Sequence, residues 1–236
     1  MRVPLVLFFV SLWLLSGLCQ PMLAQESALS QSVQAEQLLR EGHNSAYGLG
    51  GFADFQKALA AYRQAAELGN SEAMFCLGQL YAQGQGTEQS MEQAVFWYKQ
   101  AAARNNADAC LALGDLYAAG QGHSQDNVAA QTFYERALTL YQQEALKGSA
   151  MALYSLGTMY AGGLGLVQDE EKALECFQKA LVAFRREANQ GSVEAMLMLS
   201  VMYENGDGTD PDLDLANAWY LKAQGYEVDE TESLHP

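Results

Sequence analysis

An internal repeat is the feature of this sequence that most constrains its fold. A Leu-Gly pair, replaced by Leu-Ser in the last copy, recurs at spacings of 36, 43 and 43 residues: Leu77-Gly78, Leu113-Gly114, Leu156-Gly157 and Leu199-Ser200. A tyrosine follows three residues after each glycine or serine, and a Gly-x-Gly starts three residues after that tyrosine. Self-similarity at this period indicates repeating structural units that pack against their neighbours in the chain.

Each unit has the pattern of two helices joined by a glycine turn. Residues Ser71 to Gln83 are rich in Ala, Leu and Met, and Gly84 can close that helix in the left-handed conformation. Residues Ser90 to Arg104 carry apolar side chains at helical spacing: Ala94, Trp97, Tyr98 and Ala101. No strand pattern is evident in the repeats. The sequence therefore predicts an all-α fold, a right-handed superhelical solenoid of αα-hairpins.

The predicted repeat domain covers residues 33–225. Shifting the first full repeat back by 36 residues lands on Gly42, Tyr62 and Ala65, which mark a degenerate copy. Terminal repeats are often atypical because one face has no neighbour. The predicted units are 33–70, 71–106, 107–149, 150–192 and 193–225. Units 107–149 and 150–192 have 11 residues, rather than 4, between the last alanine of the second helix and the closing glycine, which predicts about two extra helical turns.

These motifs resemble the Sel1-like repeat family, which is related to the tetratricopeptide repeats. The resemblance lies in Ala73…Leu77-Gly78…Tyr81…Gly84-x-Gly86 followed by Ala94…Trp97-Tyr98-Lys99, and it covers roughly residues 33–223. It implies a superhelix whose first helices line the concave side, and a role as an adaptor in protein complexes. Bacterial members with signal peptides often act in envelope signalling, motility, export or host contact. Ser200 in place of glycine and the longer second helices depart from the commonest pattern.

One face of each first helix is a candidate partner-binding surface. Positions that vary between repeats lie at i, i+3, i+4 and i+7, which places them on the same side of a helix. The residues of this face are acidic at one edge and apolar in the middle. The predicted binding set is Glu72, Phe75, Gln79, Asp108, Leu111, Asp115, Met151, Tyr154, Thr158, Glu194, Leu197 and Val201. The alternative is that the central apolar position packs against the neighbouring first helix.

The N-terminus has the pattern of an export signal. Arg2 precedes an apolar run from Val3 to Leu18, which is short for a membrane span. We predict a signal peptide over residues 1–24, cleaved after Ala24 or, alternatively, after Cys19. An uncleaved membrane anchor is the competing hypothesis. Lipid attachment at Cys19 is disfavoured because the preceding Leu18 is bulky. The mature chain is expected in the periplasm, or else secreted. Residues 25–32 are a predicted linker and residues 226–236 an acidic, disordered tail.

The chain is strongly acidic. It has 13 Lys and Arg against 28 Asp and Glu, a net charge of −15. This charge repels phosphate backbones, which disfavours nucleic-acid partners, and it favours a basic protein or peptide partner. Solubility alone is the alternative explanation.

No pattern of catalytic or cofactor-binding residues is present in the sequence. It lacks Ser-x-x-Lys and Gly-x-Ser-x-Gly, and each Gly-x-Gly follows a predicted helix rather than a strand. His43, His123 and His235 share no spacing, and the acidic turn over residues 207–214 lacks the glycine and glutamate of a calcium loop. We therefore predict no catalytic residue, no metal and no cofactor. A glycan-binding role through Tyr154 and Phe75 is the main alternative. Hydrolysis of penicillin-like ligands, reported for some relatives, is less favoured.

Three cysteines follow the predicted signal peptide. Cys110 and Cys176 occupy positions that are apolar in the other repeats, so they are predicted to be buried thiols. Cys76 lies on the variable face and is a candidate exposed thiol. An odd number rules out complete pairing into disulfides.

Overall fold

The computed structural model describes residues 29–48, 52–121 and 125–226, and all regular structure within these ranges is helical. A first helix spans residues 29–46, so residues 29–32, predicted as linker, are helical. The helices that follow are α2 (Phe55–Glu67), α3 (Ser71–Gln83), α4 (Met91–Ala102), α5 (Ala107–Ala119), α6 (Asn127–Leu146), α7 (Ala150–Gly162), α8 (Glu170–Asn189), α9 (Val193–Asn205) and α10 (Leu213–Ala223). The first helix and the odd-numbered helices α3 to α9 are called A helices below, and the even-numbered ones B helices.

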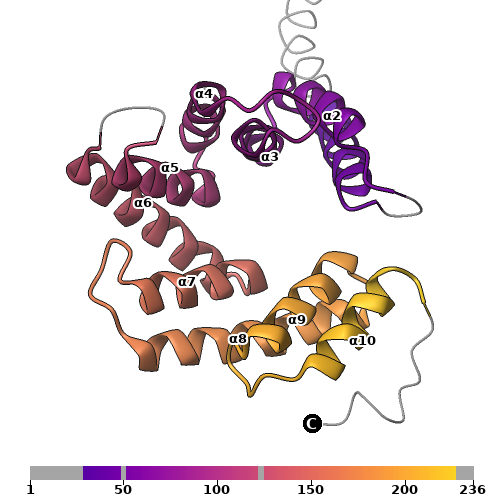
Figure 1. Cartoon of the computed structure of the whole chain (residues 1–236), viewed down its shortest axis with the longest axis vertical. Coiled ribbons are helices and arrows are strands. Elements are labelled where there is room, and N and C mark those ends of the chain that lie inside the picture. Colours follow the sequence, from indigo (N-terminus) through magenta and orange to yellow (C-terminus); the bar gives the residue numbers. More distant parts are fainter. Residues whose placement is uncertain (1–28, 49–51, 122–124, 227–236) are drawn as a thin grey trace, which may run out of the picture.

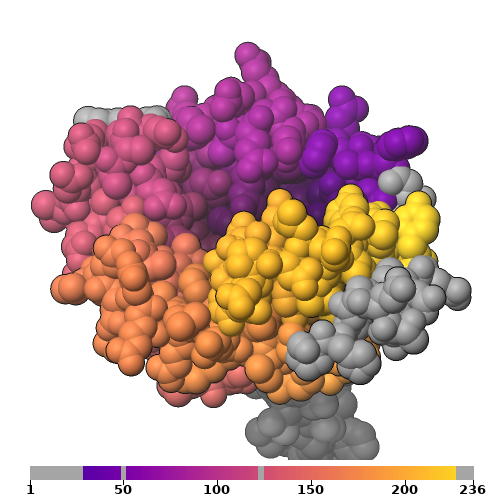
Figure 2. Space-filling model, turned by 60° about the horizontal axis from the view of Figure 1, so that its bottom comes forward, coloured from indigo at the N-terminus to yellow at the C-terminus, as the bar shows by residue number. Residues whose placement is uncertain are grey.

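The helix pairs follow one another around an open ring (Figure 1). Each helix packs mainly against the helices before and after it in the chain, as expected of a solenoid. The curvature turns the last pair, α9 and α10, back towards the first helix and α2 (Figure 1), and in the space-filling view the last repeat lies in front of the first ones (Figure 2). The predicted solenoid of αα-hairpins is confirmed.

The ends of the A helices follow from short sequence signals. Asn70 and Asn106 each accept a hydrogen bond from a backbone N–H in the first turn, at 2.8 Å and 2.7 Å, and Ser149 and Ser192 do the same for α7 and α9. Each of these four helices ends at a glycine in the left-handed conformation, with φ of 69° at Gly84. The predicted bounds of the first full A helix, Ser71 to Gln83, are those observed.

The predicted extension of two B helices is also confirmed. α6 and α8 each have 20 residues, against 12 in α4. The added turns bury Tyr141 in α6 and Phe184 in α8. Because the extension keeps the helical phase, its apolar side chains stay on the face that meets the next A helix.

The glycine of each Leu-Gly pair is required by an aromatic ring. A Cβ atom on Gly78 would lie 2.5 Å from the ring of Tyr98, and the corresponding distance from Gly114 to the ring of Tyr134 is also 2.5 Å. The third Leu-Gly glycine, Gly157, shows the same with Phe177, at 2.6 Å, and Gly42, the equivalent glycine of the degenerate first copy, with Tyr62, at 2.3 Å. In these four units the B-helix ring therefore lies directly on the backbone of its own A helix.

The last repeat shows what happens without this glycine. Ser200 takes the glycine position in α9, and Tyr220 takes the aromatic position in α10. Tyr220 is 48% exposed, whereas Tyr98 is only 5% exposed. Since the Cβ of Ser200 occupies the space that the ring fills in other units, the neighbouring Trp219 is the buried aromatic residue of α10 instead.

A second close contact joins successive repeats. Gly86, the last residue of a Gly-x-Gly, has a φ of 69°, and a Cβ there would lie 2.3 Å from the backbone oxygen of Phe55 in the preceding B helix. Gly165 and Gly208 approach Tyr134 and Phe177 in the same way, at 2.7 Å. These turns therefore set how closely one repeat stacks on the previous one.

The cysteines differ in burial. Cys110 is fully buried, as predicted, but Cys176 is only partly buried, so its prediction as a core thiol is wrong in degree. The position of a residue in the repeat indicates which face of the helix it lies on, whereas the exposed fraction of its side chain also depends on the neighbouring side chains. All three described cysteines are free thiols.

The predicted signal peptide (1–24) and most of the predicted tail (226–236) lie outside the described residues. Within residues 29–226, apart from the two short gaps, no helix is long and apolar enough to cross a membrane.

We expect the substitution Gly78→Ala to lower the free energy of unfolding by about 1–3 kcal/mol, because the new methyl group overlaps the ring of Tyr98. Ser200→Ala is the matched control, since that position already carries a Cβ, and it should change stability by less than about 0.5 kcal/mol. Urea unfolding followed by circular dichroism measures both. Equal stability of the Gly78→Ala variant and the wild type would contradict this account of the repeat.

Candidate functional site

The twelve residues of the predicted binding set come from α3, α5, α7 and α9, and none of them is buried. Glu72, Asp115, Thr158, Glu194 and Val201 are exposed, and the others are partly exposed. The variable face of the A helices is therefore accessible, whereas the invariant Leu77, Leu113 and Leu199 are completely buried. Partner binding by this face stays a prediction.

Carboxylates from different repeats gather on the concave side. The pKa of Glu72 is raised to about 7, first by partial desolvation inside the concavity and then by Glu194, Asp108, Glu36 and Glu144. We call these five residues the acidic lumen. They come from the first helix, α3, α5, α6 and α9, so the curvature of the ring brings together charges that are far apart in the sequence.

Glu194 links the two ends of the ring. Besides Glu72, its charge acts on His43 and Tyr47 at the end of the first helix. The pKa of Tyr47 is raised to about 12, by burial first and then by Glu194. Residues of the first and last repeats therefore face the same space.

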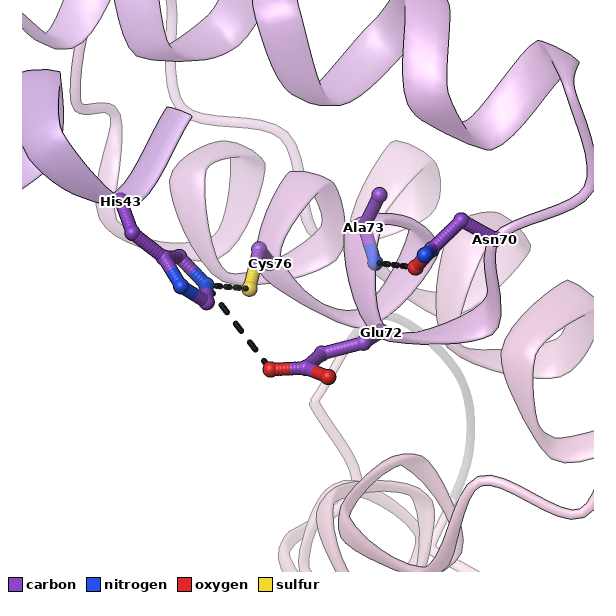
Figure 3. A network of polar contacts seen from close by, with 5 residues as sticks. All are labelled: His43, Asn70, Glu72, Ala73 and Cys76. Carbon is purple, nitrogen blue, oxygen red and sulfur yellow. Dashed lines mark hydrogen bonds and ion pairs between the residues drawn. The ribbon is translucent and has the colours of Figure 1, made fainter. Parts of the chain in front are cut away.

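Figure 3 shows how the first helix is joined to α3. His43 Nε2 lies 3.6 Å from Cys76 Sγ and 3.9 Å from Glu72 Oε1, and the carboxylate of Glu72 extends into the open centre of the ring. Burial lowers the pKa of His43, an effect that Glu194 and Glu36 oppose, so the imidazole is neutral at pH 7. Burial also raises the pKa of Cys76 far above its usual range.

This Cys-His-Glu cluster does not have the arrangement of a catalytic relay. A nucleophilic cysteine needs a lowered pKa and a base oriented by a third group through its other ring nitrogen. Here the thiol is held protonated, and Cys76 and Glu72 approach the same nitrogen of His43. The cluster instead fixes the end of the first helix against α3.

Two aspartates of the predicted set are held by tyrosines from the B helices. Tyr141 Oη donates to Asp108 Oδ1 at 2.6 Å, and Tyr134 Oη donates to Asp115 Oδ1 at 2.7 Å. Burial raises the pKa of both carboxyl groups, and the hydrogen bonds partly offset that rise. These contacts hold the two carboxylates in fixed orientations on the concave side.

The apolar residues of the predicted set pack within their own repeats. The ring of Phe75 lies 5.6 Å from that of Tyr98, and the ring of Tyr154 lies 5.4 Å from that of Phe177. Tyr154 Oη also donates to Asp207 at 3.0 Å. Both rings rest on their own B helix and the hydroxyl of Tyr154 is occupied, but both side chains stay partly exposed, so glycan binding through Tyr154 and Phe75 stays a prediction.

Sequence reasoning missed four residues of this site: Glu36, His43, Tyr47 and Glu144. Glu36 lies 36 residues before Glu72, in the same repeat register, so a signal for it was present. In the fourth repeat that register position holds Met151, and Glu144 on the extension of α6 supplies a carboxylate to the lumen instead. Nothing in the pattern of the A helices indicates Glu144.

In the described part of the chain, no group of three or more His, Cys, Asp or Glu side chains could hold a metal ion. The carboxylates of the lumen act on one another electrostatically but do not converge on one point. What the site offers is a negatively charged concave surface.

Comparisons with known proteins agree with this architecture. The family model described as Sel1 repeat matches residues 42–70, 71–106, 107–140, 150–181 and 193–223. Among solved structures, a Sel1 repeat protein from Oxalobacter formigenes is 28% identical, over 81% of this chain and 72% of that one, with a TM-score of 0.46.

Two further solved structures are more distant. A protective antigen of uropathogenic Escherichia coli that displays an SLR fold is 23% identical over 86% of this chain, which spans only 46% of that protein, with a TM-score of 0.41. Cysteine rich protein B from Helicobacter pylori is 23% identical over 53% of this chain and 93% of its own, with a TM-score of 0.39. No curated protein matches. Because the family model covers well over half of the sequence, the chain belongs to the Sel1 repeat family.

Proposed function

We propose that this protein is an exported scaffold whose concave face binds a basic segment of another protein, as an adaptor or regulator in an envelope or secreted complex. Sel1 repeats form helical scaffolds suited to protein–protein interaction, which supports binding rather than catalysis. Export rests on the sequence pattern of residues 1–24 alone.

The acidic lumen is the observation that carries the proposal. Among the described residues, the charges that act on Glu72 are all negative, and they come from four other positions around the ring. Like charges held this close raise each other's energy, and a lysine or arginine of a partner would relieve that repulsion. The exposed side chain of Glu72, 53% accessible, is open to such a partner.

The apolar residues of the face provide the second component of binding. Phe75 and Tyr154 are fixed by their B-helix rings and remain partly exposed. Aromatic side chains that are already immobilised lose little entropy when a partner covers them. An extended segment with basic and apolar side chains fits this combination of a charged edge and an apolar centre.

We expect the double substitution Glu72→Gln/Glu194→Gln to weaken binding of a short alternating Arg-Gly peptide by about tenfold, since each partly exposed ion pair is worth up to about 1 kcal/mol. Glu88→Gln/Glu204→Gln is the matched control, because both side chains are exposed and neither acts on the lumen. Fluorescence anisotropy with the labelled peptide, and with a Glu-Gly peptide as the negative control, measures the effect. Equal losses in the two variants would show that net charge alone, rather than the lumen, binds the peptide.

The pKa of Glu72, about 7, predicts a pH-dependent affinity. Glu72 is mainly neutral at pH 6 and mainly ionised at pH 8, while arginine stays charged throughout. Affinity for the Arg-Gly peptide should therefore rise from pH 6 to pH 8 by up to about fivefold. Anisotropy titrations at both pH values should show a smaller rise in the Glu72→Gln variant. An affinity that falls with pH, or rises equally in both proteins, would contradict the role of Glu72.

A further inference from the structure

A cavity of about 310 Å³ lies beside the acidic lumen, between the end of the first helix, α2 and α3. Its lining has three aromatic rings, three glutamine side chains and no charged side chain. These residues are Tyr47, Phe55, Tyr62, Gln79, Gln83 and Gln85. The volume is at the small end for ligand sites, so it suits one ring-sized group.

The glutamine amides are available to a ligand. The side chains of Gln79, Gln83 and Gln85 make no hydrogen bond to another described residue. Gln79 and Gln83 are four residues apart on α3, so their side chains are neighbours on the helix surface. Each amide can accept through its oxygen and donate through its nitrogen, which matches a ligand rich in hydroxyl groups.

The rings add an apolar surface beside these amides. Tyr62 is buried and closes the cavity, whereas Tyr47 is 49% exposed at its mouth. Tyrosine offers a flat apolar face together with a polar hydroxyl. A ligand with one apolar face and hydrogen-bonding groups at its edge is complementary to this lining.

Electrostatics narrow the ligand class further. The charges of Glu194 and Glu72 both act on Tyr47, so the cavity lies in a negative electrostatic potential. Because burial lowers the pKa of the neighbouring His43, that imidazole adds no compensating positive charge at pH 7. An anionic ligand is therefore disfavoured. No carboxylate lines the cavity, so a cation would bind at the lumen instead. A purely apolar ligand would displace water from the amides without replacing its hydrogen bonds.

We propose that this cavity binds a single neutral sugar ring, a hexose or an N-acetylhexosamine, which is either the terminal or an internal residue of a glycan. The C–H face of the sugar rests on Tyr47, and Gln79 and Gln83 hydrogen-bond to its hydroxyl or acetamido groups. This activity goes beyond the protein-binding role and depends on different side chains.

The test uses the full mature chain and defined sugars. Saturation-transfer NMR and isothermal titration calorimetry with chitotriose and maltotriose, with N-acetylneuraminic acid as the anionic comparison, should show saturable binding of at least one neutral sugar and none of the acid. The variant Gln79→Leu/Gln83→Leu should bind that sugar about tenfold more weakly. Tyr47→Phe should retain binding and Tyr47→Ala should lose most of it.

Matched variants separate this proposal from the protein-binding one. Gln93→Leu/Gln100→Leu removes two exposed glutamines of α4 that are not part of the cavity and should bind sugar like the wild type. Glu72→Gln/Glu194→Gln should keep sugar binding while losing the Arg-Gly peptide. Absence of binding by both neutral sugars would overturn the proposal. Unchanged sugar binding by a Gln79→Leu/Gln83→Leu variant that is normally helical would also overturn it.

Discussion

The contact between a backbone glycine and an aromatic ring is the interaction on which the rest of this structure depends. With no Cβ on Gly78 or its equivalents, the B-helix ring lies directly on its A helix in the first four units, so these units share the same helix-to-helix packing. The turn glycines, such as Gly86, then hold each unit against the preceding B helix. When similar steps are repeated, a small rotation per unit adds up to a curve, and here it turns the last repeat back towards the first in an open ring (Figure 1).

The acidic lumen is a product of that curvature. Glu36 and Glu194 belong to the first and last repeats, yet both act on Glu72, whose raised pKa shows that ionising a carboxyl group in this space is costly. Like charges that are concentrated on an inner surface lower the stability of the folded state, so stability alone does not explain the acidic lumen. Under the proposed function, a basic partner would relieve the repulsion that the free protein carries.

Much of the fold could be predicted from the repeat register. The bounds of α3 and the two extra turns of α6 and α8 follow from spacing, because capping and helical phase are local properties. The register also identifies Glu72, Asp108 and Glu194 as accessible. It does not show that they act on one another, since closure of the ring depends on small rotations that no local pattern encodes. Glu144 and the cavity beside Gln79 were missed because they arise from contacts between repeats or between a helix and a turn.

The central claim is that the ring brings the last repeat close enough to the first for Glu194 to act on His43. The most direct measurement is an NMR pH titration of the His43 ring protons in the wild type and in the Glu194→Gln variant. Because burial lowers the pKa of His43 and Glu194 raises it, the wild-type value should lie below 6.5 and should fall further when the charge of Glu194 is removed. The same pKa in both proteins would contradict the account, since it would mean that the first and last repeats do not face each other.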